Sequence, residues 1–165
     1  MGRTKKLALC AVLTALALGL SFVERFIPLP IPLPGIKLGL ANVVTLVALC
    51  RSGRGNALGI LVARCLLGSL FGGLTSLAFS LTGGLLSFGV MVLANKSRRL
   101  SVYGISVLGA AAHNIGQILV AMGLMGSIYV AAYLPWLLLI AVITGLLTGS
   151  LCSGILKMLP KEKRV

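Results

Sequence analysis

The sequence predicts an all-α integral membrane protein, folded as one bundle of six transmembrane helices. Of its 165 residues, 58% are hydrophobic and only 10% are charged, whereas soluble domains have about 25% charged residues. The apolar residues gather into six long runs, and six spans of about 20 residues each use nearly the whole length. Clusters of basic residues separate these runs at regular intervals. We therefore expect a single transmembrane domain, residues 1–165, without a soluble catalytic domain.

The six apolar runs give the expected positions of the helices. These are residues 7–26, 37–50, 56–72, 77–95, 102–126 and 131–157. The first run follows basic residues as a signal peptide does, but we interpret it as an uncleaved first span. Twelve of the fifteen basic residues precede the first helix, join the second to the third, join the fourth to the fifth or follow the sixth. The positive-inside rule makes that side cytoplasmic, so both termini are expected inside a multi-pass protein of the bacterial cytoplasmic membrane.

The second run is unusually short and follows a proline-rich segment. Between Lys37 and Arg51 there are 13 uncharged residues, about 20 Å of helix against a hydrocarbon core of about 30 Å. Either Lys37 reaches the outer surface from below it, or the helix starts inside the protein. The preceding PLPIPLP segment holds four of the six prolines and must be extended. We favour the second alternative, with residues 27–37 forming an outer lid loop rather than an ordinary connector.

Arg64 lies near the middle of the third predicted helix. An arginine at that depth costs at least about 2.5–3.5 kcal/mol on insertion scales, so it should face the bundle interior and have a partner. Glu24 is the only acidic candidate, since the other acidic residue, Glu162, follows the last helix. Two interpretations remain open: Arg64 binds an anionic ligand, or it is structural and donates to helix carbonyls.

The fifth predicted helix carries a polar cluster of His113, Asn114 and Gln117. His113 and Gln117 are four residues apart and share a face, with Asn114 beside them. Such a cluster either lines a cavity, bonds neighbouring helices or relays protons. Asn42 and Thr45, near the start of the second helix, could face the same cavity.

Two helices carry small residues at a spacing of four. The first has Ala11, Ala15 and Gly19, and the sixth has Ala141, Gly145, Gly149 and Ser153. Such stripes let helix backbones approach closely. Each stripe is therefore expected either to pack within the bundle or to dock another subunit.

The composition also excludes several kinds of chemistry. With only two acidic residues, the chain lacks the paired carboxylates of acid–base catalysis and a carboxylate site for Mg²⁺. The four cysteines show no CxxC spacing and the single histidine has no companion, so no metal site is indicated. A P-loop and the common hydrolase motifs are absent from the sequence. We predict no catalytic residues, no metal and no cofactor, and the clustered charge does not indicate nucleic-acid binding.

Three segments carry a family resemblance over nearly the whole chain. They are PLPIPLPGIKLGLANVVTLVAL, GGLLSFGVM and SVLGAAAHNIGQILVA, at residues 28–49, 83–91 and 106–121. They closely resemble a family of small bacterial membrane proteins labelled heptaprenyl diphosphate synthase component I, or Gx transporter family. Prenyl synthases of known type hold Mg²⁺-diphosphate with DDxxD motifs, and this chain contains no aspartate. We therefore predict that it is not itself an enzyme.

The wider resemblance is to the substrate-binding S components of energy-coupling factor (ECF) transporters. That resemblance implies six membrane helices, an outer loop after helix 1 that covers the ligand, and an AxxxA motif on helix 1 that docks the coupling subunit. Ala11 and Ala15 match the motif, the proline segment occupies the lid position, and GIKLGLAN is similar to the start of helix 2 in several S components. The vitamin-binding residues of characterised S components have no evident match, which leaves the substrate open.

The resulting hypothesis is an S-component-like protein that binds a small anionic or amphipathic solute, with an isoprenoid or quinone precursor suggested by the family label. Its expected partners are membrane lipid, the ECF coupling (T) subunit and the transporter's ATPases, with Ala11 and Ala15 for docking. The expected ligand residues are Arg64, His113, Asn114, Gln117, Asn42 and Lys37. One alternative is a non-catalytic membrane subunit of a polyprenyl diphosphate synthesising complex, and another is a membrane scaffold.

Overall fold

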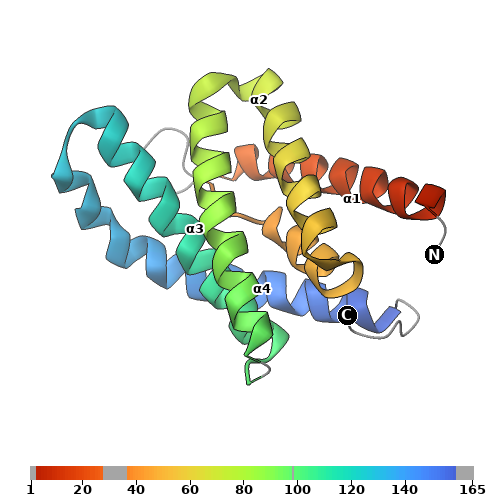
Figure 1. The fold of residues 1–165 in the computed structure, drawn as a ribbon. Helices are drawn as coiled ribbons and strands as arrows, with labels where there is room; N and C mark the ends of the chain where they lie inside the picture. Colours follow the sequence, from red (N-terminus) through yellow and green to blue (C-terminus); the bar gives the residue numbers. More distant parts are fainter. Residues whose placement is uncertain (1–2, 28–36, 98, 159–165) are drawn as a thin grey trace.

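The computed structural model describes residues 3–27, 37–97 and 99–158, and every element in these ranges is helical. The elements are α1 (Arg3–Val23), η1 (Glu24–Phe26), α2 (Asn42–Lys96), α3 (Val102–Met125), η2 (Ile128–Tyr133) and α4 (Leu134–Met158) (Figure 1). By length and composition, three helical stretches could cross a membrane: α2, α3 and the stretch Ile128–Met158. The predicted all-α membrane class is thus supported.

Helix α2 is interrupted by two glycines. Gly53 and Gly73 have φ values of 82° and 71°, in the left-handed region that glycine enters without a steric cost. They divide α2 into helical segments at residues 42–52, 54–72 and 74–96, which we call its first, middle and last segments. The middle and last segments lie side by side with the Gly73 bend at the top of Figure 1. Together with α1, α3 and α4, these segments correspond to the six predicted apolar runs.

The predicted start of the second helix was wrong. We expected it at residue 37, but residues 37–41 are not helical and the helix begins at Asn42. Gly39 has a φ of 80°, which ends any helical path through it. The last helix also starts later than predicted, at Leu134 after the 3₁₀ turns of η2. Pro135 lies in its first turn, where the missing N–H is not needed.

The first segment of α2 lies in the core. All residues from Asn42 to Leu49 are buried, and many of them form one apolar cluster with residues from α1, α3 and α4. At 1.5 Å per residue the segment is about 16 Å long, and it begins inside the bundle as we predicted. The predicted lid lies almost entirely in residues 28–36, outside the described ranges.

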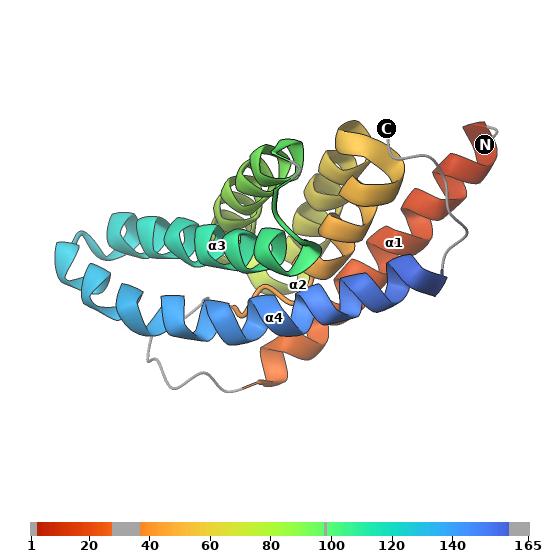
Figure 2. The ribbon, with the colours of Figure 1, turned by 90° about the horizontal axis from the view of Figure 1, so that it is seen from below.

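Helices α3 and α4 run antiparallel along each other (Figure 2), and α2 packs on α3. The sixth-helix stripe of small residues makes the α3–α4 contact close. A Cβ built on Gly145 would lie 2.5 Å from the Cα of Val107, and one on Gly149 would lie 3.1 Å from the Cα of Tyr103. The stripe on α4 therefore serves to pack this helix against α3.

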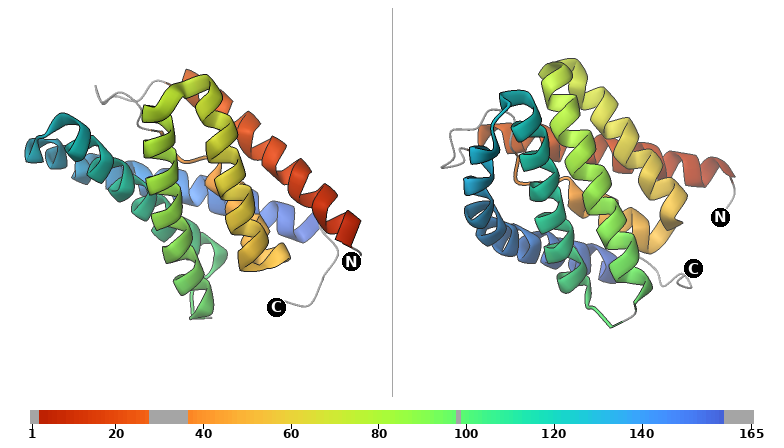
Figure 3. Two further views of the ribbon diagram at one scale, coloured as in Figure 1. Left: turned by 45° about the horizontal axis from the view of Figure 1, so that its top comes forward. Right: turned by 60° about the vertical axis from the view of Figure 1, so that its left-hand side comes forward.

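Helix α1 packs against α2. Among the described residues it makes no comparable contact with α3 or α4, and in the left view of Figure 3 it lies along α2. Ala17 is completely buried, whereas Ala11, Ala15 and Gly19 are exposed. The first-helix stripe thus faces outward. The start of α1, the Gly53 bend, the α2–α3 connection and the end of α4 all lie toward one side of the molecule (Figures 1 and 2).

Candidate functional site

The non-helical residues 37–41 enter the core and form a turn at Gly39. The backbone N–H of Asn42 donates to the carbonyl of Gly39 at 2.9 Å, and that of Val43 donates to the carbonyl of Leu40 at 3.1 Å. A Cβ at Gly39 would lie 3.0 Å from both Asn42 Nδ2 and His113 Cδ2. Glycine is required here twice, by its positive φ and by its contact with His113.

Glu24 anchors this turn to the end of α1. Its side chain is 5% exposed, and Oε1 accepts hydrogen bonds from the backbone N–H groups of Gly39 and Leu40. Buried backbone N–H groups outside a helix need such an acceptor. The sequence suggested Glu24 as a partner of Arg64. In the described structure, the hydrogen bonds of Glu24 instead hold the turn.

Arg64 reaches into the bundle from the middle segment of α2 and is 6% exposed. Its Nη2 donates to Asn42 Oδ1 at 3.0 Å, and Nη1 donates to Ser21 Oγ on α1 at 3.4 Å. Its Nε has no hydrogen-bond partner among the described residues. Both acceptors are neutral oxygens, so these two bonds fix the position of the guanidinium.

Lys37 brings a second positive charge to the same region. Its Nζ donates to Ser76 Oγ at 2.9 Å and to Ser80 Oγ at 3.0 Å, both on the last segment of α2. Its backbone N–H donates to Gln117 Oε1 on α3 at 3.3 Å. One residue of the non-helical stretch therefore contacts two helices.

Both cations line a cavity of about 310 Å³ between α1, the middle segment of α2 and the non-helical stretch. Its lining residues are Leu18, Gly19, Ser21, Phe22, Lys37, Arg64, Cys65, Gly68, Phe71 and Ser80. This volume is at the lower end of the range for small-molecule pockets, which are mostly apolar with a few convergent polar groups. The cavity is the candidate site, and it combines two cationic side chains with mostly apolar walls.

The other four predicted ligand residues do not line this cavity. Asn42 stands behind Arg64 as its acceptor. His113 and Gln117 are bonded to each other, Nε2 to Nε2, at 3.0 Å, and Gln117 holds the Lys37 backbone. Asn114 donates to the carbonyl of Leu137 on α4 at 2.7 Å. In the described structure, therefore, Arg64 and Lys37 stand at the cavity, Asn42 and Gln117 support them, His113 orients Gln117, and Asn114 joins α3 to α4.

Sequence reasoning missed the hydroxyl and wall residues of the cavity. Ser21 and Ser80 are isolated serines in apolar runs, and nothing in the local pattern distinguishes them from serines that bond their own helix. Ser76 and Ser80 are four residues apart and share a face, which is the one available signal. Gly68, Cys65 and Phe71 carry no signal, because only the packing of α1 on α2 makes them line a cavity.

A groove of about 480 Å³ lies on the outer side of α1, lined by Val12, Ala15, Leu16, Gly19 and Leu20. Ala11 and Ala15, the predicted docking residues, are both exposed on this helix.

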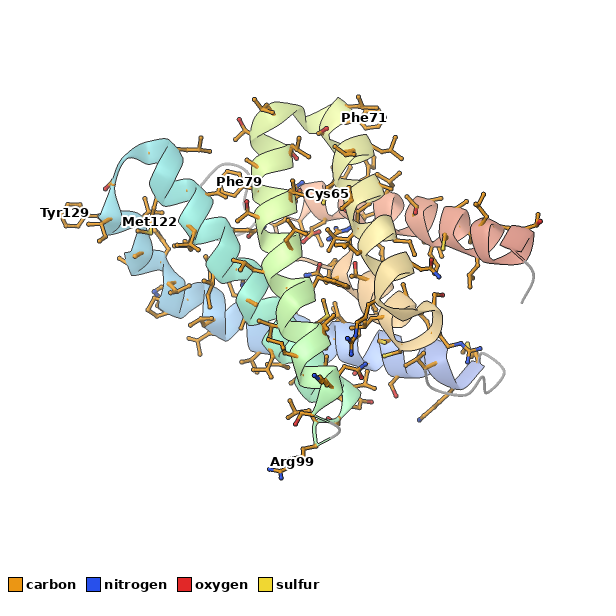
Figure 4. The ribbon with its side chains drawn as sticks, viewed as in Figure 1. Cys65, Phe71, Phe79, Arg99, Met122 and Tyr129 are labelled. Atoms are coloured by element: carbon orange, nitrogen blue, oxygen red, sulfur yellow. The ribbon has the colours of Figure 1, made fainter. Side chains whose placement is uncertain are left out.

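Figure 4 marks the two ends of the bundle: Phe71 projects outward by the Gly73 bend, and Arg99 lies at the opposite end. Among the described residues, no group of three or more His, Cys, Asp or Glu side chains comes together.

Comparison with known proteins gives one result over most of the chain. No curated protein and no solved structure matches the sequence. The family model described as heptaprenyl diphosphate synthase component I matches residues 13–155, which include α2, α3, both cation positions and most of α1 and α4. On that match, the chain belongs to the heptaprenyl diphosphate synthase component I family.

Proposed function

We propose that this chain is the substrate-binding membrane component of an ECF-type transporter, taking up a small anionic or amphipathic solute. The observation that carries the proposal is the cavity that Arg64 and Lys37 line together. Among the described residues, the buried Arg64 guanidinium has neutral hydrogen-bond acceptors and no partner for its Nε, which favours an anion beside it. The chain offers no nucleotide-binding motif, so uptake requires ATPase partners.

The outward stripe on α1 supports a coupling partner. Ala11, Ala15 and Gly19 are exposed on a helix whose other face packs on α2. Small residues on a lipid-facing surface allow a second helix to approach closely. In this proposal the T subunit docks there, and the ATPases bind on the cytoplasmic side.

The proposal also takes six spans in the cytoplasmic membrane, with both termini inside. The side of the molecule that holds the start of α1 and the end of α4 also holds the Gly53 bend and the α2–α3 connection (Figure 1). In the sequence, twelve of the fifteen basic residues lie in or next to these four parts of the chain. The positive-inside rule then places that side in the cytoplasm. The variants Ser52→Cys and Ser127→Cys, labelled in intact cells with a membrane-impermeant thiol reagent, test this. We expect the cysteine at position 52 to be protected and the cysteine at position 127 to be labelled.

The decisive test is purification of the chain from its native membrane, followed by native mass spectrometry. We expect a small-molecule adduct and copurified coupling subunit and ATPases. Finding neither would reject the proposal.

Substitution of Arg64 tests the site itself. Arg64→Gln should weaken retention of the adduct about tenfold to a hundredfold, the value of about 1.5–3 kcal/mol for a hydrogen bond to a charged group. Arg64→Lys should restore part of it, because the charge returns without the planar donor geometry. The matched control is Arg99→Gln at the exposed, opposite end of the bundle, which should retain the adduct.

A second candidate function follows from the family description, which names a synthase component. The protein would then be a non-catalytic membrane subunit that holds the apolar prenyl chain of a lipid while a soluble partner catalyses the reaction. This alternative predicts copurification with a prenyltransferase and loss of long-chain product when the gene is removed. A transporter component would instead copurify with ATPases.

A further inference from the structure

The cavity has a charged, buried end and an apolar, exposed end. Arg64 and Cys65 are buried, and Lys37 is half-buried. Phe22 and Phe71, in contrast, are 53% and 75% exposed although both line the same cavity. A closed site for a small hydrophilic anion would not need this apolar opening.

The opening lies between α1 and the middle segment of α2, where small residues stand on both helices. Gly68 lines the cavity opposite Leu18, and a Cβ built on it would be 3.9 Å from Leu18 Cδ2. On α1, no described atom outside the helix itself lies within 4 Å of a Cβ built on Gly19. Glycine at these two positions therefore leaves a passage from the cations to the side of the bundle.

The side of a membrane helix bundle faces acyl chains. Exposed residues of α1 and of the middle segment are overwhelmingly apolar, including Leu16, Leu66, Leu67 and Leu70. The passage thus connects a buried positive charge to hydrocarbon, not to water. A ligand that fits both ends must carry an acidic group and an apolar chain.

We infer that the ligand is a single-chain amphiphile with a phosphate or carboxylate head. The acidic head group of the ligand binds Arg64 and Lys37, with the Ser21 and Ser80 hydroxyls beside it. Its alkyl chain passes between α1 and the middle segment of α2 into the bilayer. This narrows the substrate class of the proposed function and rests on it. The length of the ligand's alkyl chain is then limited by the bilayer and not by the volume of the cavity.

A chain-length series tests the inference directly. The full-length protein is placed in phosphatidylcholine nanodiscs, and ethyl phosphate and hexadecyl phosphate are compared as probes, with empty discs subtracted and hexadecanol as the neutral control. We expect both phosphates to raise the thermal unfolding temperature and hexadecanol to leave it unchanged. Ethyl phosphate bound without hexadecyl phosphate would overturn the inference while leaving an anion-binding function intact. If neither phosphate binds, the anionic site of the proposed function fails as well.

Gly68→Leu tests the passage. The added side chain should block it and weaken hexadecyl phosphate binding about tenfold, with ethyl phosphate binding changed by less than about twofold. Gly59→Leu is the matched control on the same segment, since Gly59 is exposed and no described atom outside its helix would contact the new Cβ within 4 Å. Equal binding of hexadecyl phosphate by both variants would count against the passage.

Photocrosslinking of the wild-type protein tests the exit of the alkyl chain directly. A hexadecyl phosphate with a diazirine at the chain end, added to the wild-type protein, should label outward residues of α1 and of the middle segment of α2. Excess unlabelled hexadecyl phosphate should abolish this labelling, and Arg64→Gln should reduce it about tenfold. Labelling that is spread evenly over α3 and α4 as well would contradict the assigned exit.

Discussion

Helices α1 and α4 carry the same spacing of small residues but use it in opposite ways. On α4, Gly145 and Gly149 lie against the backbone of α3. On α1, Ala15 and Gly19 face outward beside a groove. A stripe of small residues therefore indicates that a helix can be approached closely, but not by what. Among the described residues, the α4 stripe is covered by α3, whereas the α1 stripe is exposed.

Gly145→Leu should have the largest effect on stability. The new Cβ would lie 2.5 Å from the Val107 Cα, and backbone at that distance cannot yield as a flexible side chain would. We expect a loss of about 3 kcal/mol in unfolding free energy, at the upper end for overpacking. Unfolding by SDS in mixed micelles measures it. Gly19→Leu on α1 is the matched change and should cost less than about 0.5 kcal/mol. Equal losses would remove the contrast between the two sides.

Glu24→Ala should come next, because it breaks the link between the α1 side and the core. It leaves the buried N–H groups of Gly39 and Leu40 without their acceptor, at about 1–3 kcal/mol. Hydrogen exchange should rise at residues 39–42 and stay unchanged in α3. Glu24→Gln, which keeps an acceptor oxygen, should recover most of the stability. Unchanged exchange in Glu24→Ala would mean that packing alone holds the turn.

A smaller effect is expected across the α3–α4 interface. The Ser106 and Thr148 hydroxyls are 2.7 Å apart and both buried. A double-mutant cycle of Ser106→Ala and Thr148→Val should give a coupling of about 0.6 kcal/mol, the average for such bonds in membrane bundles. A coupling near zero would leave glycine packing as the main attraction between these helices.

Ala15→Leu should change the stability of the protein least and its association with a partner subunit most. Ala15→Leu on the exposed stripe should alter unfolding free energy by less than about 0.5 kcal/mol, since the side chain points outward. If the proposed transporter function holds, Ala15→Leu should nevertheless abolish copurification of the coupling subunit by filling the groove. Ala132→Leu, at another exposed alanine, should leave copurification intact. If both variants still copurify the subunit, docking uses another surface.

Much of the fold could be predicted from the sequence, since hydropathy alone locates the helical segments and shows that the second is too short. The start of that segment could not be predicted, because it depends on Glu24 bonding the Gly39 turn. Arg64 could be singled out because a charge is costly at membrane depth, and it lines the cavity together with Lys37. The roles of His113 and Asn114 were not, since periodicity gives the face of a residue but not the neighbour it meets. The walls of the cavity depend on helix packing and have no local signal.

The Gly73 bend has a consequence for how the protein enters the membrane. A single residue outside helical geometry joins the middle and last segments of α2, so these two apolar stretches are too closely joined to insert independently. They should leave the translocon together as a hairpin. By then Ser21 and Asn42, which accept the hydrogen bonds of Arg64, have already been synthesised. Arg64, which is costly to transfer into lipid, thus enters the membrane when its hydrogen-bond acceptors are already present. Delayed synthesis of α3 and α4 should therefore leave the insertion of Arg64 unaffected.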